Sequence, residues 1–150
     1  MGSVVLSNMP NSSPEKIGAL KGHMVAGVLI LLLMLVRLVV RLLTAHPSAI
    51  KTGFSLADQL APIAHFLLYA SVLVMAASGI AMSVGADLPA VVFGGQGALP
   101  AEFTHLPART VHGIAAKVLM ALIALHVTAV VYHQWIRRDG LLSRMGWGAR

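Results

Sequence analysis

Two histidines and a lysine interrupt an apolar stretch in the last third of the chain. The segment VHGIAAKVLMALIALHV, residues 111–127, carries His112, Lys117 and His126. On an α-helix the 14 positions between the histidines correspond to a rise of about 21 Å and nearly four whole turns. Both imidazoles are therefore expected on one face of a helix, at different depths. Imidazole is a common ligand of haem iron, and ionisable groups inside membrane spans are candidate functional groups.

The composition is that of a membrane protein. Of the 150 residues, 57% are hydrophobic and 11% are charged, whereas soluble domains carry about 25% charged residues. The net charge of +6 comes from Lys and Arg that flank apolar runs. This distribution predicts membrane lipid, and not nucleic acid, as the partner of the basic residues. The chain has no cysteine, which excludes disulfides, iron–sulfur clusters and covalently attached haem.

Three segments are long and apolar enough to cross a bilayer, which takes about 20 residues each. They cover residues 22–43, 59–84 and 110–136. Backbone polar groups have no partners in hydrocarbon, so each span should be an α-helix. We therefore predict one all-α membrane domain over residues 1–150. The Gly- and Pro-rich loop between the second and third spans should lie over one end of the helices.

The distribution of Lys and Arg predicts the orientation. Seven of these residues lie at or beyond the inner ends of the first and third spans, against four near the outer side. The positive-inside rule then puts the N-terminus outside and the C-terminus in the cytoplasm. The seven are Arg37, Arg41, Lys51, Arg137, Arg138, Arg144 and Arg150.

A third histidine matches the depth of the first. His23 begins the first span, which runs in the same direction as the third, so His23 and His112 should lie at similar depth. Two imidazoles on neighbouring helices can clamp a planar iron porphyrin, and helix bundles build such sites in their cores. His126 would serve a second porphyrin about 20 Å further in. Taken singly, each histidine is better explained by a hydrogen bond to another helix or an interfacial position.

Two basic residues accompany these histidines. Arg37 follows His23 by 14 positions and shares its helical face, where it either meets a haem propionate or snorkels to the interface. Lys117 either steers a propionate, a quinone oxygen or an anion, or snorkels outward. Zinc is a weaker alternative to haem, because no carboxylate cluster or fourth ligand is close in sequence.

Three stretches together resemble a known family. GHMVAGVLILLLMLVRLVVRL, LAPIAHFLLY and VHGIAAKVLMALIALHV are similar to the second, third and fourth helices of bacterial cytochrome b561. The resemblance implies a four-helix membrane cytochrome with two b-type haems that exchanges electrons with quinone. It implies that the positions of His23 and His112 hold the outer haem. It also implies that His126 holds the inner haem with a histidine from the family's first helix.

That first helix has no counterpart in this sequence, so we expect three helices of an incomplete four-helix haem-binding bundle. The opening MGSVVL resembles the end of the missing helix. His65 is the remaining intramembrane histidine that could replace the missing ligand, but the predicted span boundaries separate its depth from that of His126 by roughly 6 Å. One haem b is therefore expected, and a second only if a missing helix or partner supplies a ligand.

The leading functional hypothesis is electron transfer through haem, as a quinone-linked cytochrome or as the cytochrome subunit of a dehydrogenase or hydrogenase. The family also includes members that oxidise superoxide and reduce quinone. A redox partner subunit or a second copy of the chain would complete such an assembly. The alternative is a haem-free membrane anchor or assembly subunit. Small residues in the second span suit close helix packing, and this feature fits both hypotheses. No Ser-His-Asp arrangement supports hydrolysis.

Overall fold

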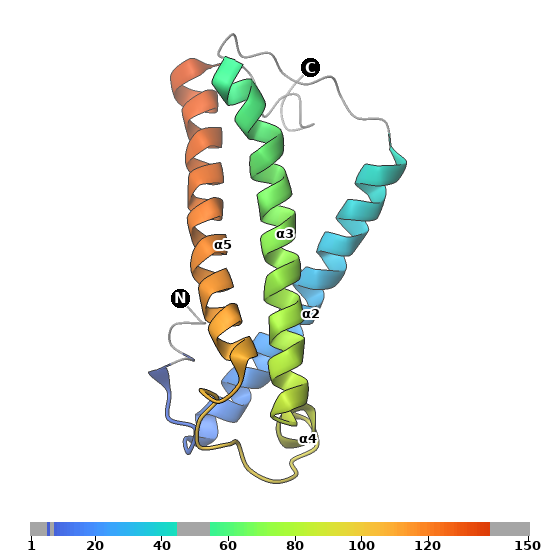
Figure 1. The fold of residues 1–150 in the computed structure, drawn as a ribbon, viewed down its shortest axis with the longest axis vertical. Helices are drawn as coiled ribbons and strands as arrows, with labels where there is room; N and C mark the ends of the chain where they lie inside the picture. Colours follow the sequence, from blue (N-terminus) through green and yellow to red (C-terminus); the bar gives the residue numbers. More distant parts are fainter. Residues whose placement is uncertain (1–5, 7, 45–54, 139–150) are drawn as a thin grey trace. The chain divides into compact units, whose positions relative to one another are not determined.

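The computed structural model describes residue 6, residues 8–44 and residues 55–138. Its principal elements are α2 (Pro14–Leu43), α3 (Ser55–Gly85), the short α4 (Leu88–Val92), α5 (Pro107–Val131) and a π-helical segment η1 (Tyr132–Arg137) (Figure 1). No strand occurs among the described residues. The prediction of an all-α protein with three long apolar helices is confirmed.

The helices extend beyond the predicted spans. α2 begins at Pro14 and not near residue 22 because Ser13 takes the N-cap position and Pro14 and Glu15 suit a first helical turn. The added residues are more polar than the apolar run, so hydropathy alone does not detect them. α3 begins at Ser55, four positions before the predicted span, and continues through Pro62. This earlier beginning matters for His65, as described below.

The third span changes its helical geometry near its end. α5 is α-helical to Val131, and Tyr132–Arg137 continue as a π-helix. Arg138 adopts a left-handed conformation with φ of 53°, and its N–H donates to the carbonyl of His133. The chain therefore keeps one continuous helical segment from Pro107 to Arg137, with a wider last part.

The chain divides into two compact units. The first unit contains α2, α3 from Val72, α4, and α5 through Ala115. The second contains α3 before Val72 and α5 from Ala116. The prediction of a single domain is not tested by this division.

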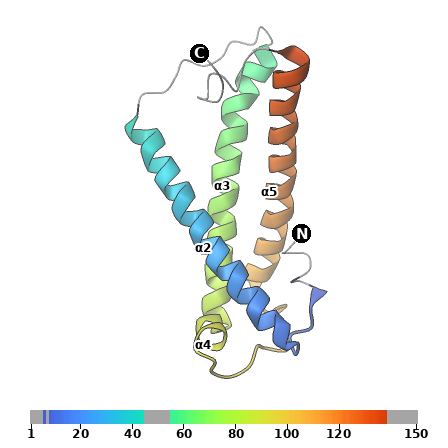
Figure 2. The same cartoon turned by 180° about the vertical axis from the view of Figure 1, so that it is seen from behind.

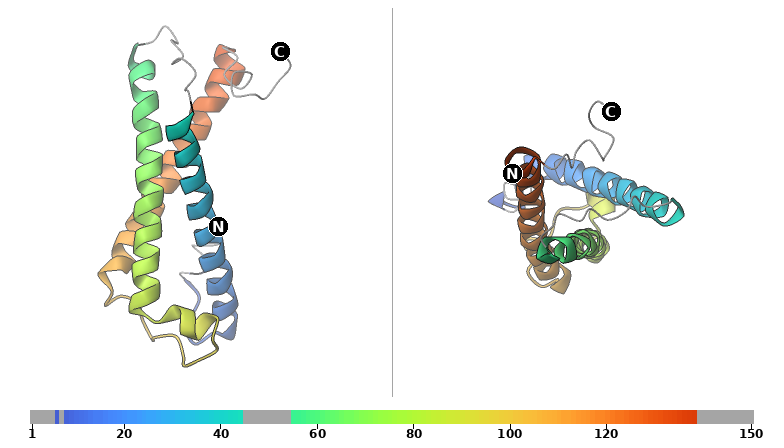
Figure 3. Two further views of the ribbon diagram at one scale, coloured as in Figure 1. Left: turned by 90° about the vertical axis from the view of Figure 1, so that its right-hand side faces the viewer. Right: turned by 90° about the horizontal axis from the view of Figure 1, so that it is seen from above.

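A small apolar core in the first unit joins α4 to α2. Leu20 of α2 is buried against Leu88 and Val92 of α4, and Met24 and Phe103 pack on this group. Figure 3 shows α4 beside the first half of α2. The predicted loop over the helix ends thus contains a helical turn of its own, which its Gly- and Pro-rich sequence did not indicate.

Polar contacts also attach this loop to the beginning of α2. The Asn11 side-chain amide donates to the carbonyls of Pro100 and Ala101, at 2.6 and 3.1 Å. The Lys16 ammonium, on a largely buried side chain, donates to the carbonyl of Met9 at 2.5 Å. Figure 2 shows the segment between α4 and α5 passing the beginning of α2. These bonds satisfy backbone carbonyls that helical hydrogen bonds do not reach.

The apolar side chains of the long helices are mostly uncovered. In the most apolar window of each of the three spans, 6% of the residues are buried within the chain. Leu33, Leu42 and Phe66 are 70%, 74% and 69% exposed. Such surfaces are stable in hydrocarbon, where apolar side chains meet lipid instead of water. The chain is a multi-pass membrane protein.

We predict that Gly94→Ala destabilises the first unit. A Cβ at Gly94 would lie 2.7 Å from the backbone oxygen of Ala90, so the turn after α4 must shift. Such overpacking costs about 1–3 kcal/mol. The expected result is a lower midpoint of thermal unfolding in detergent, followed by circular dichroism.

Gly18→Ala is the matched control for this experiment. A Cβ at Gly18 would meet nothing within 4 Å, and alanine favours a helix interior over glycine by about 1 kcal/mol. The midpoint of this variant should stay the same or rise. Equal midpoints for Gly94→Ala and the parent chain would contradict this prediction, because the turn would then accommodate the extra methyl group without loss of stability.

Candidate haem site

His112 is held by hydrogen bonds on one side of its ring. Its Nδ1 lies 3.1 Å from the backbone oxygen of Met75 and 3.1 Å from Ser78 Oγ. A carbonyl oxygen can only accept, so this contact is a hydrogen bond when Nδ1 carries the proton. The remaining nitrogen, Nε2, then has a free lone pair. A histidine that ligates a metal usually donates its other N–H to a carbonyl or carboxylate in this way.

Ser78 completes the surroundings of that ring nitrogen. The serine is 6% exposed, and its hydroxyl is 2.7 Å from the carbonyl of Val74 and 3.0 Å from that of Met75. When the hydroxyl donates to one of these carbonyls, its oxygen can accept from His112 Nδ1. One turn of α3 therefore provides two acceptors for the imidazole.

Gly79 lets α3 approach the other part of the same ring. A Cβ at this position would lie 3.2 Å from His112 Cε1 and 3.5 Å from Nδ1. The first distance is tighter than an ordinary van der Waals contact, so a side chain here would displace the imidazole. Gly79 and Ser78 were expected only to help helices pack closely. Their contacts with His112 give them a more specific role in positioning the ring.

His23 faces His112 from α2. The centroids of the two rings are 6.0 Å apart and their planes make an angle of 80°. With nitrogen–metal bonds of about 2 Å, two imidazoles on opposite sides of one metal would have ring centroids roughly 6 Å apart. The angle between the planes does not decide whether the pair can bind a metal, because each ring can turn about its own nitrogen–metal bond. The predicted juxtaposition of His23 and His112 is thus found in the structure.

The helix surface next to His23 is open. Gly27 follows His23 by one turn on the same face, and a Cβ there would meet nothing within 4 Å. A flat group can therefore lie against α2 beside the imidazole without meeting a side chain at that position. The donor set and this open face fit a porphyrin, whose four nitrogens leave two axial positions for protein ligands.

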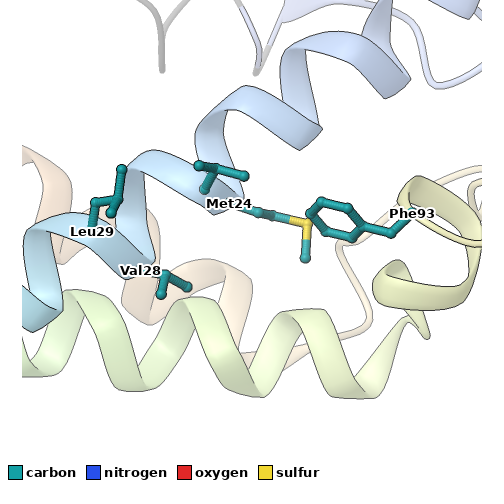
Figure 4. Close-up of a pocket in the computed structure, with 5 residues that line it drawn as sticks. Met24, Val28, Leu29 and Phe93 are labelled. Carbon is teal, nitrogen blue, oxygen red and sulfur yellow. The ribbon is translucent and has the colours of Figure 1, made fainter.

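An apolar hollow of about 250 Å³ lies between α2, from the residue after His23, and the end of α4. It is lined by Met24, Val25, Val28, Leu29 and Phe93. Figure 4 shows the Met24 sulfur next to the Phe93 ring, a contact that sulfur and aromatic rings favour. The Lys21 ammonium lies 5.6 Å from the centroid of the same ring, within the range of a cation–π interaction. The hollow therefore combines apolar walls with one cation close by.

The second unit contains another histidine pair. The rings of His65 and His126 have centroids 5.4 Å apart, with an angle of 63° between their planes. The two rings are neighbours in the structure, although the predicted span boundaries separate their depths by roughly 6 Å. α3 begins at Ser55, so His65 lies ten positions inside this helix, and His126 lies eleven positions before the end of η1 at Arg137.

The other residues singled out in the sequence are less informative. Arg37 is exposed on α2, and Lys117 is exposed on α5. His105 is exposed in the loop before α5. Arg109, one turn before His112, is a residue that the sequence analysis did not select; its Nη1 would lie 3.4 Å from a Cβ at Gly113. Three further residues named in the sequence analysis lie outside the described residues, Lys51, Arg144 and Arg150, and so does His46.

Comparison with known proteins identifies the family of the chain. The model of one family, described as prokaryotic cytochrome b561, matches residues 2–148. Comparison with curated proteins and with solved structures gave no match. The family match covers all three long helices and both histidine pairs, and it agrees with the resemblance carried by the three apolar stretches. The chain belongs to the prokaryotic cytochrome b561 family and is a b-type haem membrane cytochrome.

Proposed function

We propose that His23 and His112 are the axial ligands of one haem b, and that the chain uses it to transfer electrons to or from a quinone. The observation that carries this proposal is the 6.0 Å separation of the two rings together with the hydrogen bonds that occupy His112 Nδ1. Haem iron supplies one-electron transfer when it is bound. The protein would ligate the iron, bury the haem and control which molecules reach it.

The contacts of His112 would set the orientation of its ring and its strength as a metal ligand. The carbonyl of Met75 orients the imidazole and makes Nε2 a stronger donor to a metal. Ser78 restrains rotation of the ring by offering a second acceptor at the same nitrogen. A ligand held in this way needs little reorganisation when iron changes its charge. We therefore assign His112 as the better fixed of the two histidines that would hold the haem.

A quinone head group fits the apolar hollow beside His23. Its ring would contact the Met24 and Phe93 side chains, and the ammonium of Lys21 is a donor for a quinone oxygen. Lys117 on α5 is the other candidate donor, and Arg37 on α2 is a candidate partner for a haem propionate. A redox partner subunit or a second copy of the chain would supply or remove the electrons, as in a dehydrogenase or hydrogenase.

We predict that His23→Ala and His112→Ala each remove the haem held by this pair. Loss of one axial ligand leaves a weaker five-coordinate site, so haem content should fall by about one per chain. The measurement is haem per purified chain, together with the reduced α-band of b-type haem. His105→Ala, on an exposed loop, is the control and should keep the parent content.

Full haem retention in both single variants would contradict the assignment of this pair. A parent chain without a b-type spectrum after haem supplementation would instead support the haem-free anchor considered above. The two outcomes are distinguishable, because the spectrum of the parent chain is measured before any histidine is changed.

We also predict that Gly79→Val weakens haem binding without removing a ligand. A side chain at Gly79 would push on His112 Cε1, which a Cβ alone would approach to 3.2 Å. Displacing a group that orients a ligand typically costs about 10–100-fold in affinity, and we expect a loss of about that size. The measurement is haem titration of the apoprotein in detergent.

Ala77→Val is the control for Gly79→Val, because Ala77 is an exposed neighbour on the same helix. Its affinity should stay within about twofold of the parent value, since surface substitutions change little. Equal affinities for both variants would show that Gly79 does not position the ligand.

We further propose that the N-terminus is outside the inner membrane and the C-terminus is in the cytoplasm. Support comes from the Lys and Arg residues after the first and third spans, among them Arg137 and Arg138 at the end of η1. A reporter fused after Arg150 should be active only in the cytoplasm, and one fused before Met1 only in the periplasm. A periplasmic signal at Arg150 would reverse the orientation.

A further inference from the structure

Lys16, in the first turn of α2, carries a buried positive charge. Its side chain is 5% exposed, and its ammonium donates to the carbonyl of Met9 at 2.5 Å. An ammonium has three N–H donors, and the hydrogen bonds among the described residues account for one of them. A buried charge is costly unless it is paired and hydrogen-bonded. Lys16 therefore has donors left for a further acceptor, and an anion would suit it best.

Arg109 brings a second positive charge to the same end of the first unit. Its side chain is half-buried, and its Nη1 would lie 3.4 Å from a Cβ at Gly113. The guanidinium therefore folds back along α5 toward the turn that carries His112, where Gly113 offers no side chain to exclude it. The charge of Arg109 acts on the Lys16 ammonium and on the His112 ring. Figures 1 and 2 show α2 and α5 beginning at this end.

The carboxylates described in this unit do not neutralise the two cations. Glu15 and Glu102 accept hydrogen bonds from exposed hydroxyl groups two residues away, at 2.6 and 2.8 Å. Asp87 lies at the N-cap position of α4. Among the described residues, no hydrogen bond joins a carboxylate to Lys16 or Arg109. Like charges repel most strongly away from bulk water, so an anion between the two cations would stabilise both.

The chemistry of the two donors favours a carboxylate as that anion. A guanidinium donates two parallel N–H groups to a carboxylate, and an ammonium adds a compact charge that a second carboxylate oxygen can approach. Haem b carries carboxylates of its own, because its propionates leave one edge of the porphyrin. A site for a haem between two helices therefore needs cations on one side of the axial ligands.

Both cations lie on the same side of the first histidine pair. Lys16 precedes His23 by seven positions, which is about two turns and returns to the same face of α2. Arg109 precedes His112 by three positions, about one turn of α5. Arg37 follows His23 by 14 positions, a rise of about 21 Å, and is therefore a more distant partner for this haem.

We propose that Lys16 and Arg109 bind the propionates of the haem held by His23 and His112. The inference rests on the proposed function and adds the residues that orient the porphyrin. Two axial imidazoles fix the iron but leave the ring able to turn about the nitrogen–iron axis. Cations at one edge remove that freedom and direct the propionates toward the beginning of α2 and α5. A free carboxylate would meet the same donors, and the experiment distinguishes the two sources.

The experiment titrates the apoprotein in detergent with haem b and with haem b dimethyl ester, in which the propionates carry no charge. The quantity compared is the ratio of the two dissociation constants, because the partition of each porphyrin into detergent cancels between variants. Hydrogen bonds to charged groups are the strong ones, so Arg109→Gln should weaken haem binding about 10–100-fold. The same variant should bind the ester within about twofold of the parent value, since no charge pair is lost.

Lys16 needs a second variant, because its ammonium also attaches the segment before α2. Lys16→Gln should weaken haem binding more than ester binding, and Lys16→Arg should restore the parent ratio because it keeps the charge. Asn11→Ala is the control for loosening of the loop, since it removes the hydrogen bonds to Pro100 and Ala101 and leaves both cations. Its ratio should equal that of the parent.

Arg41→Gln is the matched control for Arg109→Gln. Arg41 is exposed in the last turn of α2, far along the helix from His23, so this variant removes one charge and should leave the ratio unchanged. A ratio that falls in Arg41→Gln by as much as in Arg109→Gln would overturn the proposal, because net charge alone would then explain the effect.

The remaining outcomes also decide the proposal. An unchanged ratio in Arg109→Gln, or equal losses of haem and ester affinity, would overturn it. Equal affinities of the parent for haem and ester would overturn it and leave a free anion as the occupant. If the ratio is unchanged in Arg109→Gln while His23→Ala loses its haem, this inference fails and the proposed function stands. If His23→Ala keeps its haem affinity while Arg109→Gln lowers the ratio, the proposed ligands fail and the propionate site stands.

Discussion

The hydrogen bond between His112 Nδ1 and the Met75 carbonyl fixes the geometry on which the first histidine pair depends. It joins α5 to α3 at a point where both helices are otherwise apolar, and it determines which ring nitrogen is available to a metal. Ser78 and Gly79 act through the same ring, the first by accepting from it and the second by having no side chain. Three residues of α3 therefore converge on one imidazole of α5. Helix α2 then has to supply only the second ring.

The long helices are stabilised mainly by the lipid around them. Each span buries only 6% of its most apolar window within the chain, and the small core around Leu20 belongs to the α2–α4 contact. In water such exposed apolar surfaces would be unstable, whereas a bilayer covers them with acyl chains. The polar contacts at Asn11 and Lys16 act near the beginning of α2, where water or head groups replace hydrocarbon. The chain thus uses lipid for its apolar surface and specific hydrogen bonds for its loops.

Much of this arrangement is predictable from the sequence. The three spans follow from hydropathy, and the depth match of His23 and His112 follows from their positions at the beginning of parallel spans. The predicted depth of His65 depended on where the second span begins, and α3 begins earlier than predicted because hydropathy marks the apolar run and not the more polar turn at Ser55 that precedes it. α4 was missed because five residues in a Gly- and Pro-rich loop give too short a pattern to detect.

The π-helical segment at the end of α5 has a consequence for how this chain can vary in length. A π-helical turn accommodates one more residue than an α-helical turn. Deleting one residue between Tyr132 and Arg137 would therefore return the segment to α-helical geometry, and the residues on either side of it would keep their faces. The same deletion before Val131 would instead rotate everything beyond it by about 100°, which is one α-helical position. The loss of one residue should thus be absorbed at the end of this helix, whereas a deletion between His112 and His126 would put the two histidines on different faces.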